Sequence, residues 1–407
     1  MTDLSKRIGR LSPEQVRELR QRLPPARQPT PEAGSYGGDH SGTGMAFSVM
    51  FFSGNGDVAQ EGKYRLLLES ARFADERGFS AVWTPERHFQ AFGGLFPNPS
   101  VLGAAIAAVT KRIAIRAGSV VLPLHHPIRV AEEWSVVDNL SGGRVALSAA
   151  TGYHPGDFIL APESYNRRRE IMFERLDIVR RLWRGEPVAF PSVDGTEMPV
   201  TILPRPLQPN LPVWITSSTN PATWKAAGEL GCNLLSGLSG IGDKHLTDLE
   251  QKIALYRGAR ARNGHDPGQG IVTLMLHSYI GDDFELVKRR VRAPLAGYLR
   301  TFVAQDANLT TETTRLAAGV SEEDRESLIS HALEGLLRTA SLIGTEDTCA
   351  ATVRRFQNLG VNEIACFIDF GLDDDMVSEG LERLDGLRAR FAPAAQAATT
   401  DAEPVKS

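Results

Sequence analysis

The sequence predicts an α/β protein whose main domain is a closed (β/α)8 TIM barrel with insertions at the C-terminal face. Eight short apolar runs alternate with longer amphipathic stretches between residues 45 and 392. These runs are apolar throughout instead of alternating with polar residues, which is typical of parallel strands buried on both faces. Eight such units fit a closed barrel, and an open doubly wound sheet is the alternative.

The first four β/α units show clear start and stop signals. The first helix carries apolar residues at helical spacing from Tyr64 to Ala74 and stops at Gly78. The third helix ends at Ser141-Gly142-Gly143. We expect strands at 45–52, 79–84, 113–121 and 144–150, and helices ending at 78 and spanning 99–110, 128–140 and about 168–183.

The last four units are predicted in the same way, with two segments left over. Residues 185–206, rich in Pro and β-forming residues, predict a hairpin that covers a barrel end, and residues 293–342 predict a mostly helical insertion. Insertions after barrel strands lie on the C-terminal face, so the second segment is either a lid over the substrate or a surface elaboration. We expect strands at 213–217, 233–236, 271–280 and 363–369, and helices at 221–230, 243–262, 347–359 and 376–391.

The two ends of the chain differ in composition from the barrel. Residues 1–44 predict a short helix, which begins at Ser12-Pro13, followed by a Pro/Gly-rich linker. Residues 393–407 are rich in Ala and Thr and predict a disordered tail.

Composition excludes several classes of protein. A net charge of −4 over 407 residues gives no positive field to hold nucleic acid or an anionic membrane. No apolar run has membrane-spanning or signal-peptide character, so we expect a cytoplasmic protein. The three cysteines lack metal-ligand spacing, so neither a disulfide framework nor a metal site is expected.

The chemistry is predicted to lie in turns that directly follow strands. The sequence contains no GxxxxGK[ST], HExxH or GxSxG motif, and no GxGxxG motif after a strand, so kinase, zincin and hydrolase functions lose their usual support. Because the C-terminal ends of barrel strands meet at one rim, turns that follow different strands form one site. Four polar turns are candidates, at 84–89, 117–127, 150–156 and 216–221.

The order and spacing of these turns resemble the bacterial luciferase family from about Met45 to Phe391. Among its relatives, the luciferase-like monooxygenases of natural-product assembly lines are the more similar, on Leu342-Ile343-Gly344-Thr345 and residues 360–371. The main resemblance is carried by Glu86-Arg87-His88-Phe89, Asn98-Pro99, Gly118-Ser119, Leu122-Pro123, Asp138-Asn139-Leu140-Ser141-Gly142-Gly143-Arg144 and Thr151-Gly152-Tyr153.

The resemblance implies a monooxygenase that binds FMN at the barrel mouth and receives it reduced from a separate flavin reductase. In such enzymes, O2 forms a flavin C4a-(hydro)peroxide, which hydroxylates the substrate or attacks a carbonyl in a Baeyer–Villiger reaction. The implied substrate is a small molecule or an acyl group tethered to a carrier protein, and a homodimer is usual in the family. Two alternatives remain open: an F420-dependent hydride-transfer oxidoreductase on the same fold, and a non-catalytic flavin- or carrier-binding protein.

Three residues of the first turn are the candidates for catalysis. His88 is predicted either to position groups and transfer a proton at the flavin or to be a structural histidine. Arg87 is predicted to hold a carboxylate or stabilise a peroxide anion, or else to pair with Glu86. The sequence departs from luciferases here, because the histidine usually given the acid/base role aligns with Arg87.

The candidate cofactor residues lie in the other turns. Gly118 and Ser119 match the position of a non-prolyl cis peptide beneath the flavin ring in the family. A helix start with free N–H groups suits the phosphate. The remaining cofactor candidates are Thr151, Tyr153, His154, Arg168, Ser217, Ser218, Thr219 and Asn220. On the substrate side, Asn98 is either an N-cap or a substrate-binding group, and His125 either lines the pocket or closes its strand.

Overall fold

The computed structural model describes residues 44–52, 62–90, 93–238, 240, 242–307 and 322–392. The expected N-terminal helix, nearly all of the linker and the C-terminal tail lie outside the described residues.

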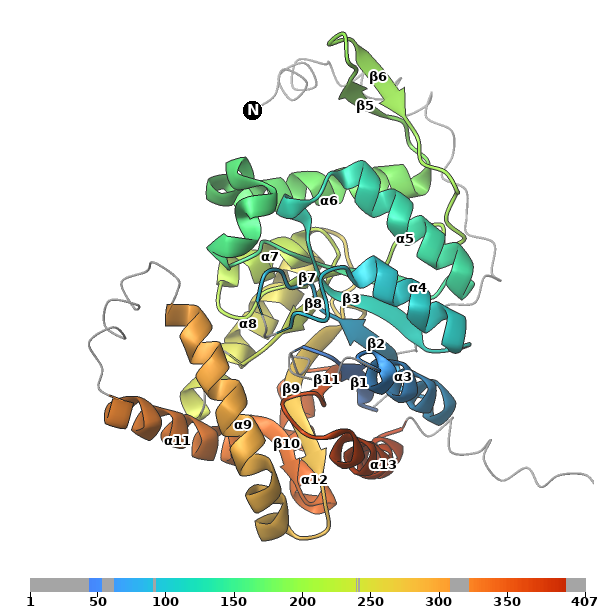
Figure 1. Ribbon diagram of the computed structural model, residues 1–407. Coiled ribbons are helices and arrows are strands. Elements are labelled where there is room, and N and C mark those ends of the chain that lie inside the picture. The colour runs from blue at the N-terminus through green and yellow to red at the C-terminus, as the bar shows by residue number, and fades with distance from the viewer. Residues whose placement is uncertain are drawn as a thin grey trace, which may run out of the picture. The chain divides into compact units, whose positions relative to one another are not determined.

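Eight parallel strands close into a ring (Figure 1). Each strand pairs with the next along the chain, and the last, β11, pairs with both β1 and β9. The pairing of β8 with β9 completes the ring, which confirms the closed barrel over the open sheet. The strands are β1 (Ala46–Met50), β2 (Ala81–Thr84), β3 (Ala114–Val121), β4 (Val145–Ala150), β7 (Val213–Thr216), β8 (Asn233–Ser236), β9 (Val272–Ile280) and β11 (Glu363–Phe367).

Helices surround this ring, and their apolar faces pack onto the outside of the strands (Figure 1). Their ends follow the sequence signals: Gly78 and Gly142 terminate two helices in the left-handed conformation, and Thr345 begins another with a capping box. The helices are α3 (Arg65–Arg77), α4 (Pro99–Val109), α5 (Pro127–Ser141), α6 (Arg168–Arg184), α7 (Pro221–Glu229), α8 (Asp243–Arg262), α12 (Glu346–Asn358) and α13 (Asp374–Arg390). None of the described helices is long and apolar enough to cross a membrane.

The first insertion is a hairpin, as expected. Strands β5 (Val188–Pro191) and β6 (Glu197–Val200) pair antiparallel, and most of their side chains are exposed or half-buried. The expected placement was wrong, because the hairpin projects beyond α6 instead of covering an end of the barrel (Figure 1).

The second insertion is mostly helical but differs from the expectation in two ways. Helix α9 (Phe284–Ala307) begins before residue 293 and continues through Pro294, and α11 (Glu322–Thr339) follows. The segment then ends in a strand that was not predicted, β10 (Ser341–Gly344). This strand pairs with residues 277–280 of β9, beyond the residues of β9 that pair with β8.

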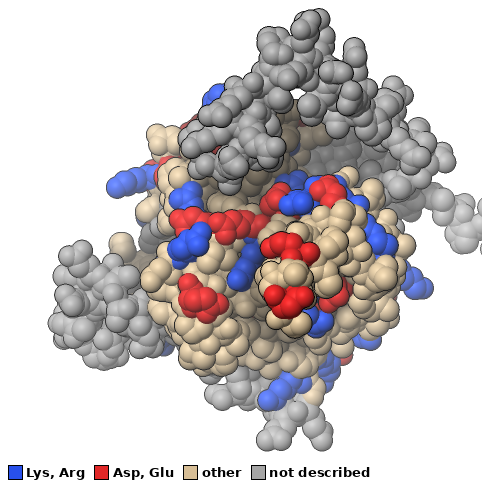
Figure 2. Space-filling model, turned by 90° about the horizontal axis from the view of Figure 1, so that it is seen from above, with Lys and Arg blue, Asp and Glu red and all other residues tan. Residues whose placement is uncertain are grey.

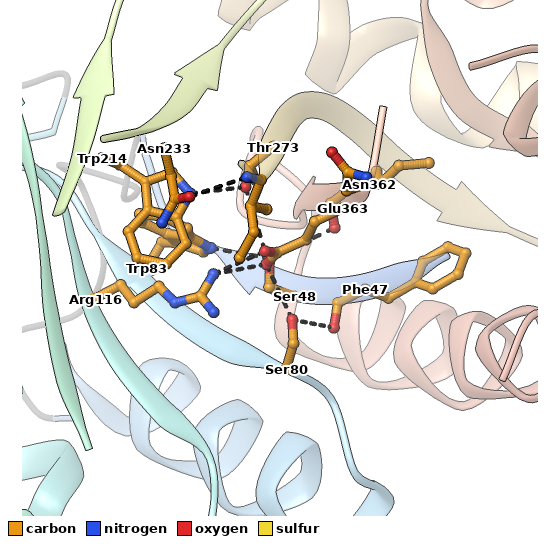
Figure 3. Close-up of polar contacts among 12 residues, drawn as sticks. Phe47, Ser48, Ser80, Trp83, Arg116, Trp214, Asn233, Thr273, Asn362 and Glu363 are labelled. Atoms are coloured by element: carbon orange, nitrogen blue, oxygen red, sulfur yellow. Dashed lines mark hydrogen bonds and ion pairs between the residues drawn. The ribbon is translucent and has the colours of Figure 1, made fainter. Parts of the chain in front are cut away.

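The N-terminal end of the barrel interior is filled by a buried ion pair (Figure 3). Arg116 donates to Glu363 at 2.8 Å, and the guanidinium lies against the rings of Trp83 and Trp214, 4.9 and 4.3 Å from their centroids. Ser80 and Thr273 also donate to the Glu363 carboxylate, at 3.0 and 3.2 Å. We call Arg116, Glu363, Ser80 and Thr273 the Glu363 cluster.

The C-terminal end of the interior is less completely filled. Side chains alternate between the two faces of a strand. Trp214 and Thr273 lie in the barrel interior, so residues an even number of positions further along the same strands, and those level with them on neighbouring strands, also point inward. At the C-terminal ends, such inward-facing side chains are partly exposed, whereas Trp214 and Thr273 are buried. Solvent therefore reaches the barrel interior from the C-terminal mouth. The partly exposed residues are Ala150, Thr216, Met275 and His277.

Candidate functional site

The four predicted turns meet at the C-terminal mouth, and hydrogen bonds join them. The turn after β2 is joined to that after β3 through Val121, whose N–H donates to Glu86 at 2.7 Å. The turn after β2 is joined to that after β4 by Arg87, which donates to the Tyr153 hydroxyl. The cis-peptide region of β3 is joined to the end of β7 by a hydrogen bond between Ser119 and Thr216.

Glu86 is the centre of a buried polar cluster at this mouth. Its carboxylate is hydrogen-bonded to His88 Nε2 at 2.8 Å and to His125 Nε2 at 2.5 Å. The carboxylate is fully buried, whereas the side chain of His125 remains 33% exposed. We call Glu86, His88 and His125 the Glu86 cluster.

Electrostatics favour the charged form of this cluster. Burial raises the pKa of Glu86, but the hydrogen bonds from His125 and His88 outweigh it, so the pKa lies below its usual value. Burial lowers the pKa of His125, but the Glu86 carboxylate outweighs that effect and raises it. Glu86 is therefore an ionised carboxylate that favours the protonated form of the adjacent His125 imidazole. His125 pairs with Glu86, and its side chain is also partly exposed at the mouth.

Arg87 is a buried cation in an aromatic setting. Its guanidinium lies 4.2 Å from the centroid of Phe52 and 5.5 Å from that of Tyr153. Stacking on aromatic faces is favourable for a planar guanidinium, which needs less hydration than an ammonium. The arrangement places a permanent positive charge beside the Glu86 cluster.

The turn after β4 is fixed by its own contacts. His154 is hydrogen-bonded to Gln90 through its ring nitrogens and lies 3.7 Å from Asp157. Arg168, one of the cofactor candidates, donates to the carbonyl oxygens of Gly152 and Tyr165 at 3.2 and 2.8 Å. One of its nitrogens, Nε, therefore supports the turn that carries the half-buried Thr151.

The peptide bond between Gly118 and Ser119 is cis, as expected. The register of β3 against β4 shifts at this point, between Gly118 and Val120. A Cβ on Gly118 would lie 3.0 Å from Trp83 and 3.1 Å from Met50, so glycine allows the backbone to pack directly on these side chains. The Ser119 hydroxyl then points inward, where Thr216 joins it to Ser148.

The turn after β7 begins α7 with a polar N-terminus. Asn220 is the N-cap and accepts from the N–H of Ala222 at 3.0 Å, while Thr219 is exposed and Ser217 and Ser218 are half-buried. The first N–H groups of a helix carry a partial positive charge that favours anions. A second cation, not predicted from the sequence, lies behind this turn: buried Lys252 donates to the Ser218 carbonyl at 2.5 Å.

Asn98 has the N-cap role, one of the two roles left open for it. Its side-chain oxygen accepts from the N–H groups of Ser100 and Val101 at 2.9 and 3.1 Å, and from the Ser100 hydroxyl. This oxygen is therefore committed to α4, and nothing in its contacts favours a substrate-binding role.

Two residues at the mouth were missed by the sequence reasoning. His277 on β9 and Tyr298 on α9 lie in T-shaped contact, with ring centroids 4.6 Å apart. The sequence carried one signal for His277, a histidine at an inward-facing position of an apolar strand. Within the described ranges, no group of three or more His, Cys, Asp or Glu side chains could hold a metal ion.

Comparisons of the sequence with known proteins indicate one family. The family model described as luciferase-like monooxygenase matches residues 45–363. The oxygenase component of the flavin-dependent trigonelline monooxygenase of Acinetobacter baylyi is 25% identical over 335 residues, 80% of this chain and 89% of that protein.

Solved structures share the fold. The FMN complex of the oxygenating constituent of 3,6-diketocamphane monooxygenase from Pseudomonas putida superimposes with a TM-score of 0.68 at 19% identity, over 86% of this chain and 98% of that one. The F420-dependent tetrahydromethanopterin reductase of Methanopyrus kandleri does so with a TM-score of 0.62 at 15% identity, over 86% of this chain and 100% of that one.

Proposed function

Because the chain belongs to the luciferase-like monooxygenase family, we propose that it is the oxygenase component of a two-component system that uses reduced FMN. A separate reductase supplies the reduced flavin, and O2 is the second substrate. The same family membership establishes a flavin-dependent monooxygenase as the class of enzyme, whereas the cofactor form and the substrate belong to this proposal.

The arrangement at the mouth supports FMN. A phosphate fits the N-terminus of α7, where the side chains of 217–219 are half-buried or exposed. Behind this turn, Lys252 donates to the Ser218 carbonyl and pairs with Asp248. A planar ring fits the floor at Gly118-Ser119 and Thr216, where the barrel interior is open to solvent. The adjacency of these two features, marked by the hydrogen bond between Ser119 and Thr216, is the observation that carries the proposal.

Reduced FMN bound there supplies the activation of O2 and the transfer of one oxygen atom. The protein holds and moves the proton. With Nε2 of His88 bonded to Glu86, Nδ1 is the atom through which His88 exchanges a proton with the reacting groups. Arg87 supplies a fixed positive charge for an anionic group at the site, and His125 keeps Glu86 ionised.

The substrate in this proposal is a small organic molecule or an acyl group on a carrier protein, within secondary metabolism. Oxygen is transferred by hydroxylation or in a Baeyer–Villiger reaction, and the enzyme works as a homodimer. Turnover of free molecules together with failure on every carrier-bound thioester would remove the carrier protein from the proposal.

The test of the function is oxygen chemistry with the loaded protein. Mixing the protein, loaded with reduced FMN, with O2 should produce a transient absorbance distinct from reduced and oxidised flavin. An F420-dependent enzyme, the alternative, would show no O2 consumption and would require F420. A protein with no affinity for FMN in either redox state contradicts the proposal.

The role of His88 is tested by substitution. His88→Ala should lower the rate of product formation by about 10²-fold or more, because a positioned proton-transfer group contributes that much to the rate. His126→Ala is the matched control, since His126 lies outside the Glu86 cluster, where it caps α5 and contacts the ring of Phe190. Product formation by His88→Ala at the wild-type rate would remove His88 from the mechanism.

A further inference from the structure

His277 is a polar residue in an apolar setting at the mouth. It lies on β9 at the level where β11 ends, paired with Phe367. Three aromatic rings surround its imidazole, with centroids 4.6, 5.3 and 5.4 Å away, from Tyr298, Phe367 and Phe370. The Nε2 atom of His277 is buried and has no hydrogen-bond partner.

A buried nitrogen without a partner costs free energy, so native structures keep few of them, often at functional sites. The side chain points inward near the C-terminal mouth, and although this atom is buried, the residue as a whole is partly exposed. A bound ligand that covered this part of the mouth and bonded to Nε2 would satisfy the nitrogen.

The charge state of His277 selects the kind of ligand. Burial lowers the pKa of His277 to about 4, so the imidazole is neutral at physiological pH. A neutral imidazole has one nitrogen that donates and one that accepts. Together with the surrounding aromatic rings, it suits a flat, apolar compound that carries an uncharged polar group.

The position of His277 separates it from the proposed flavin floor. Strand β9 lies four strands from β3 in either direction around the ring, on the opposite side of the barrel from Gly118-Ser119. Tyr298, its closest ring neighbour, comes from helix α9 of the second insertion. The insertion therefore contributes a side chain to the wall that faces the floor.

We propose that His277 and Tyr298 form the substrate-binding wall, where Nε2 of His277 hydrogen-bonds an uncharged hydroxyl group of a cyclic or aromatic substrate. This inference rests on the proposed function, because it assigns the opposite side of the mouth to FMN. It makes the second insertion part of the specificity site.

The test compares two probe ligands that differ by one hydroxyl group, phenol and toluene. Each is titrated into the FMN-loaded protein, and the visible spectrum of the flavin is followed. The ratio of the toluene Kd to the phenol Kd should be about threefold to tenfold larger in the wild type than in His277→Phe. The variant keeps an aromatic ring at this position but loses the polar nitrogens. His331→Phe, at an exposed position of α11, is the control and should behave as wild type.

Two outcomes would overturn the inference: no phenol binding to the FMN-loaded wild type, or the same phenol-to-toluene ratio in wild type and His277→Phe. His277→Leu, of similar volume, is measured in the same way if the Phe variant loses FMN. Failure of the wild type to bind FMN is a separate result, which contradicts the proposed function itself.

Discussion

Two buried carboxylates lie at opposite ends of the barrel and are paired with different cations. Glu363, at the N-terminal end, is bonded to Arg116, and both side chains are buried. Glu86, at the C-terminal mouth, is bonded to His88 and His125. An arginine stays protonated at every pH that the fold survives, whereas a histidine titrates near neutrality.

The difference separates a structural from a chemical use of a buried charge. The Glu363 cluster fills the N-terminal end of the barrel interior, with hydroxyl groups and two tryptophan rings around a fixed ion pair. The Glu86 cluster keeps an ionised carboxylate next to His125, and this carboxylate raises the pKa of the His125 imidazole. Substitutions at the two ends should therefore differ in size and in pH dependence.

The largest effect is expected at the Glu363 cluster, at the N-terminal end of the barrel. Arg116→Met leaves the Glu363 carboxylate buried without its cation and should lower the free energy of unfolding by about 3–5 kcal/mol. Chemical denaturation followed by tryptophan fluorescence measures this loss.

The double variant Arg116→Met/Glu363→Met is the matched control. It removes both charges, so it should recover much of the stability that the single variant loses. Equal losses in the single and double variants would show that packing between Trp83 and Trp214, and not the unpaired charge, dominates.

A smaller and pH-dependent effect is expected at the mouth. Glu86→Gln keeps the shape of the side chain and loses the charge, so it should cost about 1–3 kcal/mol of folding free energy at about pH 6. The cost should shrink as the pH rises through the folded-state pKa of His125, where the imidazole loses its proton. Denaturation of both proteins below and above that pKa gives the difference.

The sign follows from the two pKa directions. The pKa of Glu86 is lowered in the folded state, so its contribution is present above the unfolded value of about 4.3 and is lost as the pH falls through the folded value. The pKa of His125 is raised, so its contribution is complete below about 6.5 and is lost as the pH rises through the folded value. A cost that grows toward alkaline pH would contradict the ion pair.

The contrast between the ends also explains what the sequence could predict. All eight barrel strands and the helices after them were predicted, because buried parallel strands are apolar runs and glycines mark the helix ends. Strand β10 was missed, since Ser341–Gly344 follows α11 almost directly and lies at the end of the mostly helical insertion. The early start of α9 was missed as well, because Pro294 lies inside the helix, where proline is normally unfavourable.

Residues in strand-end turns were predictable, whereas those that closure of the barrel brings to the mouth were not. Glu86, Arg87 and His125 lie in turns whose position relative to the strands is readable from the chain. Lys252 lies within α8, four residues after Asp248, with which it pairs at 2.6 Å, a spacing typical of an exposed helix face. Only the packing of α8 against α7 buries it beside Ser218.

Lys252 sharpens the comparison, since it is a buried lysine that pairs with Asp248 and lies behind the turn proposed to hold the phosphate. Lys252→Met should weaken FMN binding about threefold to tenfold, because it removes a positive charge from behind the α7 N-terminus. Affinity for riboflavin, which lacks the phosphate, should not change. Fluorescence titration measures both, with Lys225→Met on the exposed face of α7 as control. An equal loss for riboflavin would mean that Lys252 only supports the fold.

The smallest effect is expected at Asn98, which precedes α4 near the mouth yet is bonded like a structural residue. Asn98→Ala removes the N-cap and should lower the free energy of unfolding by about 1 kcal/mol, while Asn98→Asp keeps it. Because the side-chain oxygen already accepts from Ser100 and Val101, FMN affinity and O2 consumption should be unchanged in both variants. Loss of turnover in a folded, FMN-binding Asn98→Ala protein would instead assign Asn98 to the substrate, and proximity to the mouth would then outweigh local bonding as a guide to function.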